Sequence, residues 1–289
     1  MDVHTIHPEL LERRVRVLVV GCGGVGSAVT AGLPYLHQAL VVRGHPGGLH
    51  VTVQDGERIS ATNCVRQPFS KSEIGLYKSV VLVNRLNMFW GLDWEAIPED
   101  LVGDQPTTYM DIIIGCVDSR AARAIIQRCA TRSSTVAYWL DIGNNADSGQ
   151  FILGEPLNLT NPRRRIRLRS VAELYPEVID AELDDNSVPS CSAAEALERQ
   201  EPFVNATLAN HALSLLAQLF RYGRITHHGG FVNLSTGMTT PLRIDPGLWR
   251  RIQRRRDLSV LGGARPSPAV TRTAPHEDNA GTQRLYSEA

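Results

Sequence analysis

Four glycines, spaced as Gly21-x-Gly23-Gly24-x-Gly26, close an apolar run and open a stretch of small residues with helical spacing. The run itself, VRVLVV at 15–20, is too uniformly apolar for a half-exposed strand and predicts a strand covered on both faces of a parallel sheet. Glycines at such a strand-to-helix turn let the backbone approach a phosphate, and the helix that follows offers free N–H groups and a positive dipole end. The sequence therefore predicts a nucleotide near Gly21–Gly26; the alternative is a tight turn that binds no ligand.

An acid, Asp55, stands at the tip of the second predicted strand, LHVTVQ at 49–54. A carboxylate in this place can accept the ribose hydroxyls of a nucleotide. It lies further from the glycines than the spacing of about 20 residues that is usual for dinucleotide folds, because a turn-rich insertion precedes the strand. This departure weakens a plain NAD interpretation, although an NAD-dependent oxidoreductase remains an alternative.

Further polar residues follow in a fixed order. They are Glu57, then Asn63-x-x-Arg66-Gln67, then Gly75-x-x-Lys78, then a strand that ends Cys116-Val-Asp118, and finally Arg123. A dehydrogenase would leave Asn63, Arg66 and Lys78 without a role. The ordered set resembles the ubiquitin-activating-enzyme-like family, the ThiF, MoeB and HesA group, closely over roughly residues 15–130 and more loosely as far as the terminal hairpin.

The resemblance implies an enzyme that activates a carboxylate by attack on the α-phosphate of ATP. Carried over by motif, Asp55 would hold the ribose, Arg66 and Lys78 would grip the phosphates with Asn63 beside them, and Asp118 would bind Mg²⁺. A carboxylate oxygen suits this hard cation. No general base is required, because the attacking carboxylate is already ionised at pH 7. A cation such as Lys78 is unfavourable at a helix N-terminus, so we expect an anion near it.

The family also suggests partners and a further step. Some relatives carry a thioester- or persulfide-forming cysteine where Cys191 lies in SVPSCS; the alternatives are an incidental loop cysteine or the remnant of a zinc ligand. The long segment before Cys191 and the lack of zinc cysteines resemble the ThiF-like protein of the PRTRC cassette. The resemblance implies a ubiquitin-like small protein as substrate and a homodimer. Relatives often supply an arginine from a second subunit, but Arg13 and Arg14 adjoin the first strand too closely to match.

Bulk properties exclude several classes. The 289 residues carry 30 basic and 30 acidic side chains, so there is no overall electrostatic case for nucleic acid or an anionic membrane. No apolar run is expected to cross a bilayer, and the N-terminus lacks the apolar segment of a signal peptide. Five cysteines without a C-x-x-C pair indicate reduced thiols in the cytoplasm. The basic runs at 163–169 and 250–256 read as solvated faces or partner contacts, and His227-His228 reads as a turn.

Hydrophobic periodicity predicts an α/β fold, a Rossmann-like doubly wound, mainly parallel sheet with a C-terminal antiparallel hairpin. We expect a lead-in at 1–14 with one helical turn, an adenylation domain at 15–260 with a long crossover loop at 154–200, and a disordered tail at 261–289. Pro34 is expected to kink or end the first part of its helix. Helices are expected at 24–40, 78–88, 120–131, 201–220 and 248–257, and strands at 15–20, 49–54, 92–97, 110–117, 135–140, 149–153, 229–235 and 238–244.

The third alternative for function is a non-catalytic module that keeps the fold to bind a partner.

Overall fold

The computed structural model describes residues 2–103, 107, 109–162, 166–184 and 201–261. Cys191 and the tail beyond 261 lie outside these residues. The chain divides into two units, residues 1–249 and 250–289, and the description below concerns the first. Of the second, the described part is the end of helix α9, which runs from Pro246 to Leu261.

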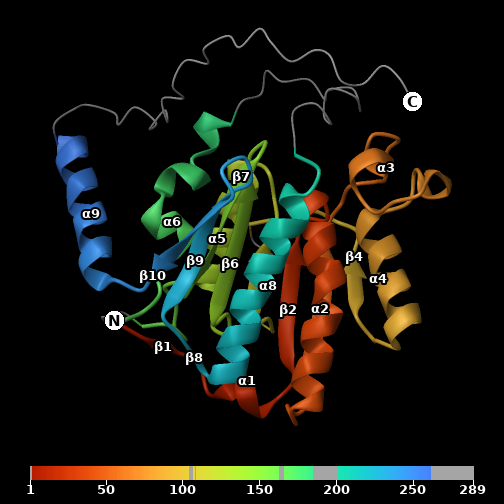
Figure 1. Cartoon of the computed structure of the whole chain (residues 1–289), viewed down its shortest axis with the longest axis horizontal. Helices are drawn as coiled ribbons and strands as arrows, with labels where there is room; N and C mark the ends of the chain where they lie inside the picture. The colour runs from red at the N-terminus through yellow and green to blue at the C-terminus, as the bar shows by residue number, and fades with distance from the viewer. Residues whose placement is uncertain (1, 104–106, 108, 163–165, 185–200, 262–289) are drawn as a thin grey trace, which may run out of the picture. The chain divides into compact units, whose positions relative to one another are not determined.

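A central sheet carries the fold (Figure 1). Its order within the described residues is β10-β9-β7-β6-β5-β2-β3-β4, and the five strands from β4 to β6 run parallel. The remaining three continue it antiparallel. Its strands are β2 (Val15–Val20), β3 (Leu49–Gln54), β4 (Glu95–Ile97), β5 (Ile112–Gly115), β6 (Tyr138–Asn144), β7 (Ser148–Gly154), β9 (His227–Asn233) and β10 (Met238–Arg243). The expected mainly parallel α/β fold is therefore confirmed.

The parallel strands are apolar because helices cover both faces of the sheet. All four residues of β5, and every residue but one in β2 and in β3, are buried. The helices of the described chain are α1 (Glu9–Glu12), α2 (Gly24–Val42), α3 (Asn63–Arg66), α4 (Lys78–Trp90), α5 (Arg120–Arg132), α6 (Val171–Leu174), α8 (Val204–Tyr222) and α9. Short 3₁₀ turns η1 (Lys71–Glu73), η2 (Pro176–Ile179) and η3 (Ala181–Leu183) lie between them.

The order in which the chain adds strands to the sheet reverses between β2 and β5, although these two strands run parallel. The crossovers β2-α2-β3 and β3-α4-β4 proceed toward one edge, whereas β5-α5-β6 proceeds toward the other. Because such crossovers are right-handed, α2 and α4 cover one face and α5 the opposite face. In open sheets of this kind ligands bind outside the carboxyl ends of the strands at the point of reversal. That point lies between the residues that follow β2 and those that follow β5.

Several local expectations were wrong. Pro34 does not end its helix: it is buried inside α2, which continues to Val42 and packs against α8 and α4. His227 and His228 do not form a turn but begin β9, and the Nδ1 atom of buried His228 lies 2.8 Å from the carbonyl oxygen of Leu153. Burial lowers the pKa of His228 to about 4. The basic run at 163–169 is not wholly a solvated face, because Arg167 is fully buried and pairs with Glu173.

The N-terminal lead-in is more structured than expected. Besides the short helix α1, it forms the strand β1 (His4–Thr5), which pairs antiparallel with β8 (Arg224–Ile225). The buried carboxylate of Glu155 lies 2.9 Å from the Nε2 atom of His7. The first residues of the chain are therefore attached to the antiparallel part of the fold.

Helix α2 bears on the expectation that no apolar run crosses a bilayer. By length and composition it is apolar enough to cross a bilayer, the one such helix among the described residues. Half of its most apolar window is nevertheless buried inside the structure. A core helix packed between neighbours meets the same criterion, so this is weak evidence for a membrane span.

Candidate active site

The glycine turn joins the ends of three neighbouring strands. Gly21 has a φ of +91°, and its N–H donates to the carbonyl of Gln54 at the end of β3. A Cβ atom on Gly21 would lie 2.7 Å from the carbonyl oxygen of Cys116, which follows β5, and one on Gly26 would lie 2.0 Å from the oxygen of Gly21. Both positions are therefore restricted to glycine by backbone contacts within the turn.

Gly23 faces the open side of the turn. A Cβ atom there would meet no atom of the described residues within 4 Å. Gly23 is also the N-cap of α2, and no side chain caps the helix at this position. The first N–H groups of an uncapped helix and its positive dipole end attract an anion. The structure thus leaves room for a ligand where the sequence predicts a phosphate.

Two asparagines border this turn that the sequence analysis did not identify. The side chain of Asn205, near the start of α8, lies 2.5 Å from the position of a Cβ atom on Gly24. Its Oδ1 atom accepts a hydrogen bond of 3.1 Å from the Nδ2 group of Asn144, at the end of β6. Asn144 follows a predicted strand, which is a usable signal, but nothing in the local sequence brings Asn205 to the glycine turn.

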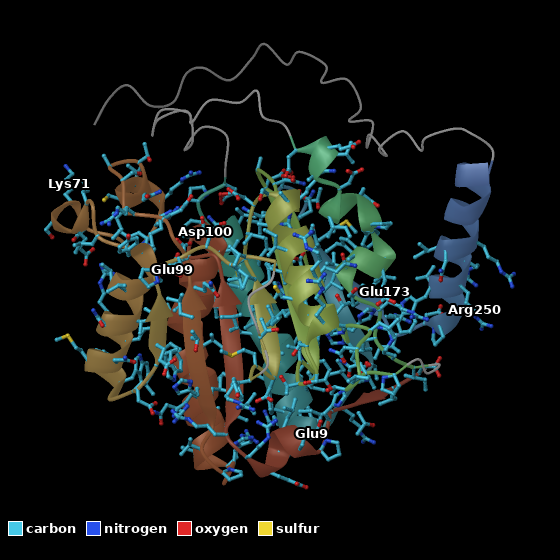
Figure 2. The ribbon with its side chains drawn as sticks, turned by 180° about the vertical axis from the view of Figure 1, so that it is seen from behind. Glu9, Lys71, Glu99, Asp100, Glu173 and Arg250 are labelled. Carbon is cyan, nitrogen blue, oxygen red and sulfur yellow. The ribbon has the colours of Figure 1, made fainter. Side chains whose placement is uncertain are left out.

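Asp55 lies at the predicted place and supports the turn directly. Its carboxylate accepts a hydrogen bond from the backbone N–H of Cys22, inside the glycine turn, and one of 2.8 Å from the N–H of Glu57. Burial raises the pKa of Asp55, although both hydrogen bonds and nearby Lys78 oppose the shift. Asp100, which follows β4, accepts a hydrogen bond of 3.3 Å from the N–H of Gly56. Figure 2 shows Asp100 at this end of the molecule, away from Glu9 at the other.

Lys78 begins α4 and has an anion beside it, as expected. That anion is the carboxylate of Glu57, which forms an ion pair with the lysine Nζ atom. The lysine side chain is 3% exposed and that of Glu57 is 68% exposed. The ammonium group is therefore held by a flexible, solvated partner that can yield to a second anion.

Asn63 and Arg66 lie on a separate loop that projects at the same end, as the position of α3 in Figure 1 shows. Asn63 is buried and accepts hydrogen bonds from the N–H and hydroxyl of Ser60, so it shapes the loop. Arg66 is exposed, and no side chain in the described part of the molecule pairs with it. The loop is tied to α4 by Arg85, which pairs with Glu73 and donates to the carbonyl of Pro68.

Asp118 follows β5 and is exposed to solvent. The next helix, α5, has its first N–H groups already satisfied: the carboxylate of Asp184 accepts from Arg120 at 2.9 Å and from Ala121 at 3.0 Å, and Ser119 accepts from Ala122 at 3.2 Å. These backbone bonds also lower the pKa of Asp184. Of the two helix N-termini at the reversal of the sheet, α2 is open to a phosphate and α5 is closed by its own chain.

Arg123, on α5, is buried and fixes the backbone around Asp118. Its guanidinium donates to the carbonyl oxygen of Val117 at 2.8 Å and lies 3.5 Å from that of Asp118. It also donates to the carboxylate of Asp141 on β6 at 3.2 Å. Asp141 is fully buried, its Oδ2 atom has no hydrogen-bond partner among the described residues, and burial raises its pKa to about 6.

The described cysteines fit structural roles. Cys22 and Cys129 are buried, and burial raises the pKa of the Cys22 and Cys116 thiols far above the ordinary value. A thiol with a raised pKa is a poor nucleophile at neutral pH. Cys64 is partly exposed in the loop that carries Arg66. Cys191 lies outside the described residues.

Asp118 stands alone as a candidate metal ligand in the ranges described above. No group of three His, Cys, Asp or Glu side chains there could hold a metal ion. Mg²⁺ commonly binds through one or two carboxylates together with substrate phosphates and water. A single exposed carboxylate opposite the glycine turn fits a Mg²⁺ ion that arrives with its nucleotide, and it does not fit a resident metal centre.

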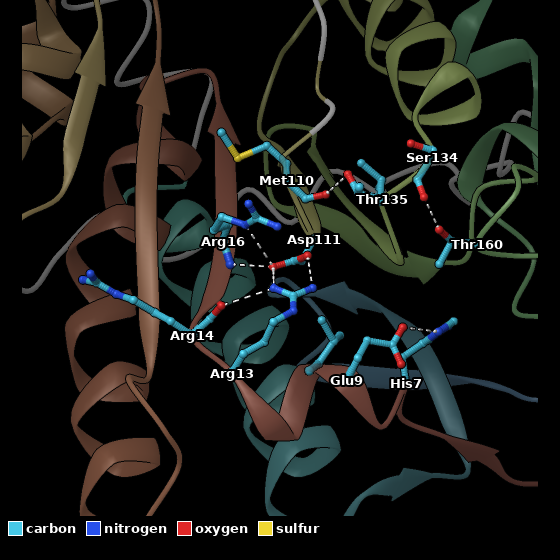
Figure 3. A network of polar contacts seen from close by, with 12 residues as sticks. His7, Glu9, Arg13, Arg14, Arg16, Met110, Asp111, Ser134, Thr135 and Thr160 are labelled. Carbon is cyan, nitrogen blue, oxygen red and sulfur yellow. Dashed lines mark hydrogen bonds and ion pairs between the residues drawn. The ribbon is translucent and has the colours of Figure 1, made fainter.

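Arg13 and Arg14 lie at the other end of the parallel strands. Arg13 forms a bidentate pair with Asp111, with both N–O distances 2.7 Å (Figure 3). Arg14 pairs with Asp93. Both precede β2, whereas the glycine turn follows it. Neither arginine therefore reaches the active site of its own chain.

Comparisons with known proteins show the family and the fold of the chain. The model of the ThiF family matches residues 9–239. The fold is similar to that of PaaA, with a TM-score of 0.54 and 13% identity over 80% of this chain and 64% of that one. It is also similar to E. coli MccB with ATP (TM-score 0.50, 16% identity, 80% and 64% covered) and with MccA-N7isoASN (TM-score 0.50, 14% identity, 80% and 64% covered). The chain thus spans less than two thirds of these proteins' length. No curated protein matches.

Proposed function

Because the chain belongs to the ThiF family, we propose that it is an ATP-dependent adenylating enzyme that activates a carboxylate. One observation carries the proposal: Gly23 faces open space at the uncapped N-terminus of α2, where the sheet reverses and Asp118 follows the adjacent strand. This is where a nucleotide's phosphates would gain both backbone donors and a carboxylate for their metal ion.

In the proposed reaction, a carboxylate oxygen of the substrate attacks the α-phosphorus of ATP. The bond from that phosphorus to the bridging oxygen breaks, and pyrophosphate leaves with the electron pair. The products are an acyl adenylate and pyrophosphate. The protein's contribution is positioning and charge neutralisation, as in phosphoryl transfer generally.

The residues have distinct proposed roles. The turn at Gly21–Gly26 admits the phosphates, and Asp55 holds both the turn and the ribose. Arg66 and Lys78 neutralise charge on the leaving pyrophosphate. Lys78 would do so by exchanging exposed Glu57 for a phosphate oxygen. Mg²⁺, when bound with ATP, would draw charge from the phosphate oxygens and take Asp118 as its protein ligand.

Finer features belong to the same proposal. The substrate is the C-terminal glycine of a ubiquitin-like or sulfur-carrier-like protein, and Cys191 would take the activated acyl group afterwards. The structural neighbour MccB has been crystallised with MccA-N7isoASN and with MccA, which supports a second component as substrate. The enzyme would act as a homodimer in the cytoplasm, within a PRTRC-type gene set.

The test is ATP–pyrophosphate exchange with small proteins that end in glycine. We expect exchange that depends on one such protein. The exchange rate should fall at least about 100-fold in Asp118→Asn and in Arg66→Ala, since each removes a charged group that stabilises the transition state. Glu95→Gln, which neutralises an exposed carboxylate at the start of β4, is the matched control and should exchange normally. Normal exchange by both site variants, with folding confirmed by circular dichroism, would contradict the site.

A further inference from the structure

The first residue of α2 lies against a side chain of α8. The two helices pack side by side, with Asn205 at Gly24 and, further along both helices, Leu213 at Gly32. A Cβ atom on either glycine would collide with the side chain opposite it. Glycine at these two positions of α2 therefore lets α8 approach closely enough to bring the amide of Asn205 to the glycine turn.

The amide of Asn205 is held with its NH₂ group free. Its Oδ1 atom accepts the hydrogen bond of 3.1 Å from Asn144, whereas its Nδ2 atom has no partner among the described residues and is accessible to solvent. Nδ2 is also the amide atom nearest to the Cβ position of Gly24. Leu208, one turn later, is fully buried against Gly149, so the start of α8 is fixed. Asn205 thus presents two N–H donors at the turn, and its acceptor is already used.

These donors lie beside the backbone donors at the start of α2, where Gly23 faces open space and no side chain caps the helix. In the proposed complex the ribose lies at Asp55, whose carboxylate is bonded to the N–H of Cys22 in the same turn. The α-phosphate is the phosphate joined to the ribose, so it is the one that comes to this turn. Lys78 begins α4, and α2 lies between α4 and α8 (Figure 1). The amide of Asn205 and the lysine therefore approach the nucleotide from opposite sides of α2.

We propose that Asn205 binds the α-phosphate of the nucleotide and that Asn144 positions its amide. The inference rests on the proposed function for the identity of the nucleotide. In the adenylation step a bond forms between a carboxylate oxygen and the α-phosphorus, and pyrophosphate leaves with the electron pair of the bond that breaks. Asn205 donates to a non-bridging oxygen of the α-phosphate throughout, and no proton is transferred. A fixed donor of this kind stabilises the charge that develops on that oxygen.

The test is calorimetric titration of the full-length protein with AMP, which carries the α-phosphate alone, and with adenosine, which carries none. We expect Asn205→Ala to weaken AMP binding about five- to tenfold, as the loss of one hydrogen bond does. Asn205→Asp keeps the acceptor for Asn144 and the shape against Gly24 but replaces the donors with a carboxylate, so it should weaken AMP binding further. Adenosine should bind both variants like the wild type. Asn210→Ala removes an exposed asparagine from the same helix and is the matched control.

Double variants test where the amide acts. The far end of the Asn205 side chain can move aside for a methyl group, so Gly24→Ala should displace it and weaken AMP binding about as much as Asn205→Ala does. Adding Gly24→Ala to Asn205→Ala should then cause no further loss. Asn144→Ala should likewise weaken AMP binding in the wild type and have no effect in Asn205→Ala. Additive losses in both pairs would show that Asn205 does not act through these contacts.

The inference and the proposed function can fail separately. Normal AMP affinity in Asn205→Asp, or equal losses for AMP and adenosine, would overturn the inference and leave adenylation untouched. AMP binding that depends on Asn205, without pyrophosphate exchange by the wild type, would support the inference and contradict adenylation. A wild type that binds no AMP would contradict both. In an enzyme that exchanges, kcat should fall about 100-fold in Asn205→Ala, more than the affinity for AMP, because the donor is needed most in the transition state.

Discussion

Gly23 and Gly26 stand three residues apart in one turn, yet the structure assigns them different constraints. A methyl group on Gly26 would collide with the backbone oxygen of Gly21, whereas one on Gly23 would enter open space. Gly26 is therefore required by the fold, whereas the fold does not require glycine at position 23. A motif of four glycines therefore contains at least two kinds of requirement.

This distinction can be measured. We expect Gly26→Ala to lower the free energy of unfolding by about 3 kcal/mol, because a backbone atom cannot move aside cheaply. Gly23→Ala should change stability by less than about 1 kcal/mol and weaken ATP binding about tenfold, since the methyl group occupies the approach to the helix N-terminus. Urea unfolding and ATP titration of both variants provide the comparison. Wild-type ATP affinity in Gly23→Ala would show that no phosphate approaches this position.

Asp141 gives the second prediction at the residue scale. Its pKa is about 6 in the folded chain, against an ordinary 3.8, because burial disfavours the charged carboxylate. An acid that binds its proton more tightly when folded makes stability fall as pH rises between these two values. Asp141→Asn is neutral at every pH. Relative to this variant, the wild type should lose about 1.4 kcal/mol per pH unit across that interval.

The carboxylate of Asp141 should also affect activity, because it holds Arg123. Without its carboxylate partner, Arg123 is less well held against the carbonyls of Val117 and Asp118. We therefore expect Asp141→Asn to exchange pyrophosphate more slowly than the wild type at pH 7.5, and the difference in stability between the two proteins to change in favour of the variant as pH rises from 4 to 6. Unfolding curves of both proteins between pH 4 and pH 7.5 measure how the stability of each depends on pH. Parallel stability profiles across that range would contradict the assigned burial effect.

At the scale of elements, Asp111 joins the beginnings of three strands. Its carboxylate accepts from Arg13 and from the backbone N–H of Arg16 in β2, and its own carbonyl accepts from Ala137 just before β6. The active-site residues at the far ends of these strands depend on the register that such contacts set. The contacts of Asp111 thus hold the strands together at one end, and the candidate active site lies at their other end.

Two ion pairs at that end should differ in strength. Asp111→Asn removes a fully buried charge and leaves Arg13 and Arg16 without a counter-ion, so we expect a loss of about 3 to 5 kcal/mol. Asp93→Asn breaks the exposed pair with Arg14 and should cost less than about 1 kcal/mol. Denaturant unfolding at low and high salt measures both. Equal losses in the two variants would show that burial does not determine the contribution of these pairs.

At the scale of the whole chain, the order of strands decides where on the sheet a ligand can bind. The reversal between β2 and β5 brings the glycine turn beside the segment that carries Asp118. Two alternatives to adenylation are compatible with a fold of this class, an NAD-dependent oxidoreductase and a binding module. They differ in the nucleotide that stabilises the folded state.

Ligand-dependent unfolding separates these alternatives. ATP with Mg²⁺ at about 100 times its Kd should stabilise the protein by about 2.7 kcal/mol, which corresponds to a rise in Tm of about 5 to 10 °C for a chain of this size. NADH at the same concentration should leave Tm unchanged. Asp118→Asn should retain ATP binding but lose most of its dependence on Mg²⁺. A rise in Tm with NADH and none with ATP would favour the oxidoreductase.

Much of the fold is local in origin and could be read from the chain. The strands at 15–20 and 49–54 occur with the expected bounds, because continuous β-branched and apolar runs between turn residues have no stable alternative to a buried strand. The order of the elements then limits the topology, since parallel crossovers are right-handed. The candidate site residues consequently lie at the carboxyl ends of the parallel strands, as their positions after strands or at helix starts predict. They are the glycine turn, Asp55, Lys78 and Asp118.

The remaining features depend on contacts between distant segments. Pro34 stays inside α2 because neighbouring helices pack around it, and β1 forms because β8 lies beside it. Glu57 as the partner of Lys78, Asp141 as the partner of Arg123, and Asn205 against Gly24 each join residues from different elements. Local sequence determined which elements form and which chemistry their ends carry. Only the tertiary structure decided which charges are buried, which are paired and which side of the glycine turn stays open, because burial and pairing are set by whatever the fold places opposite each side chain.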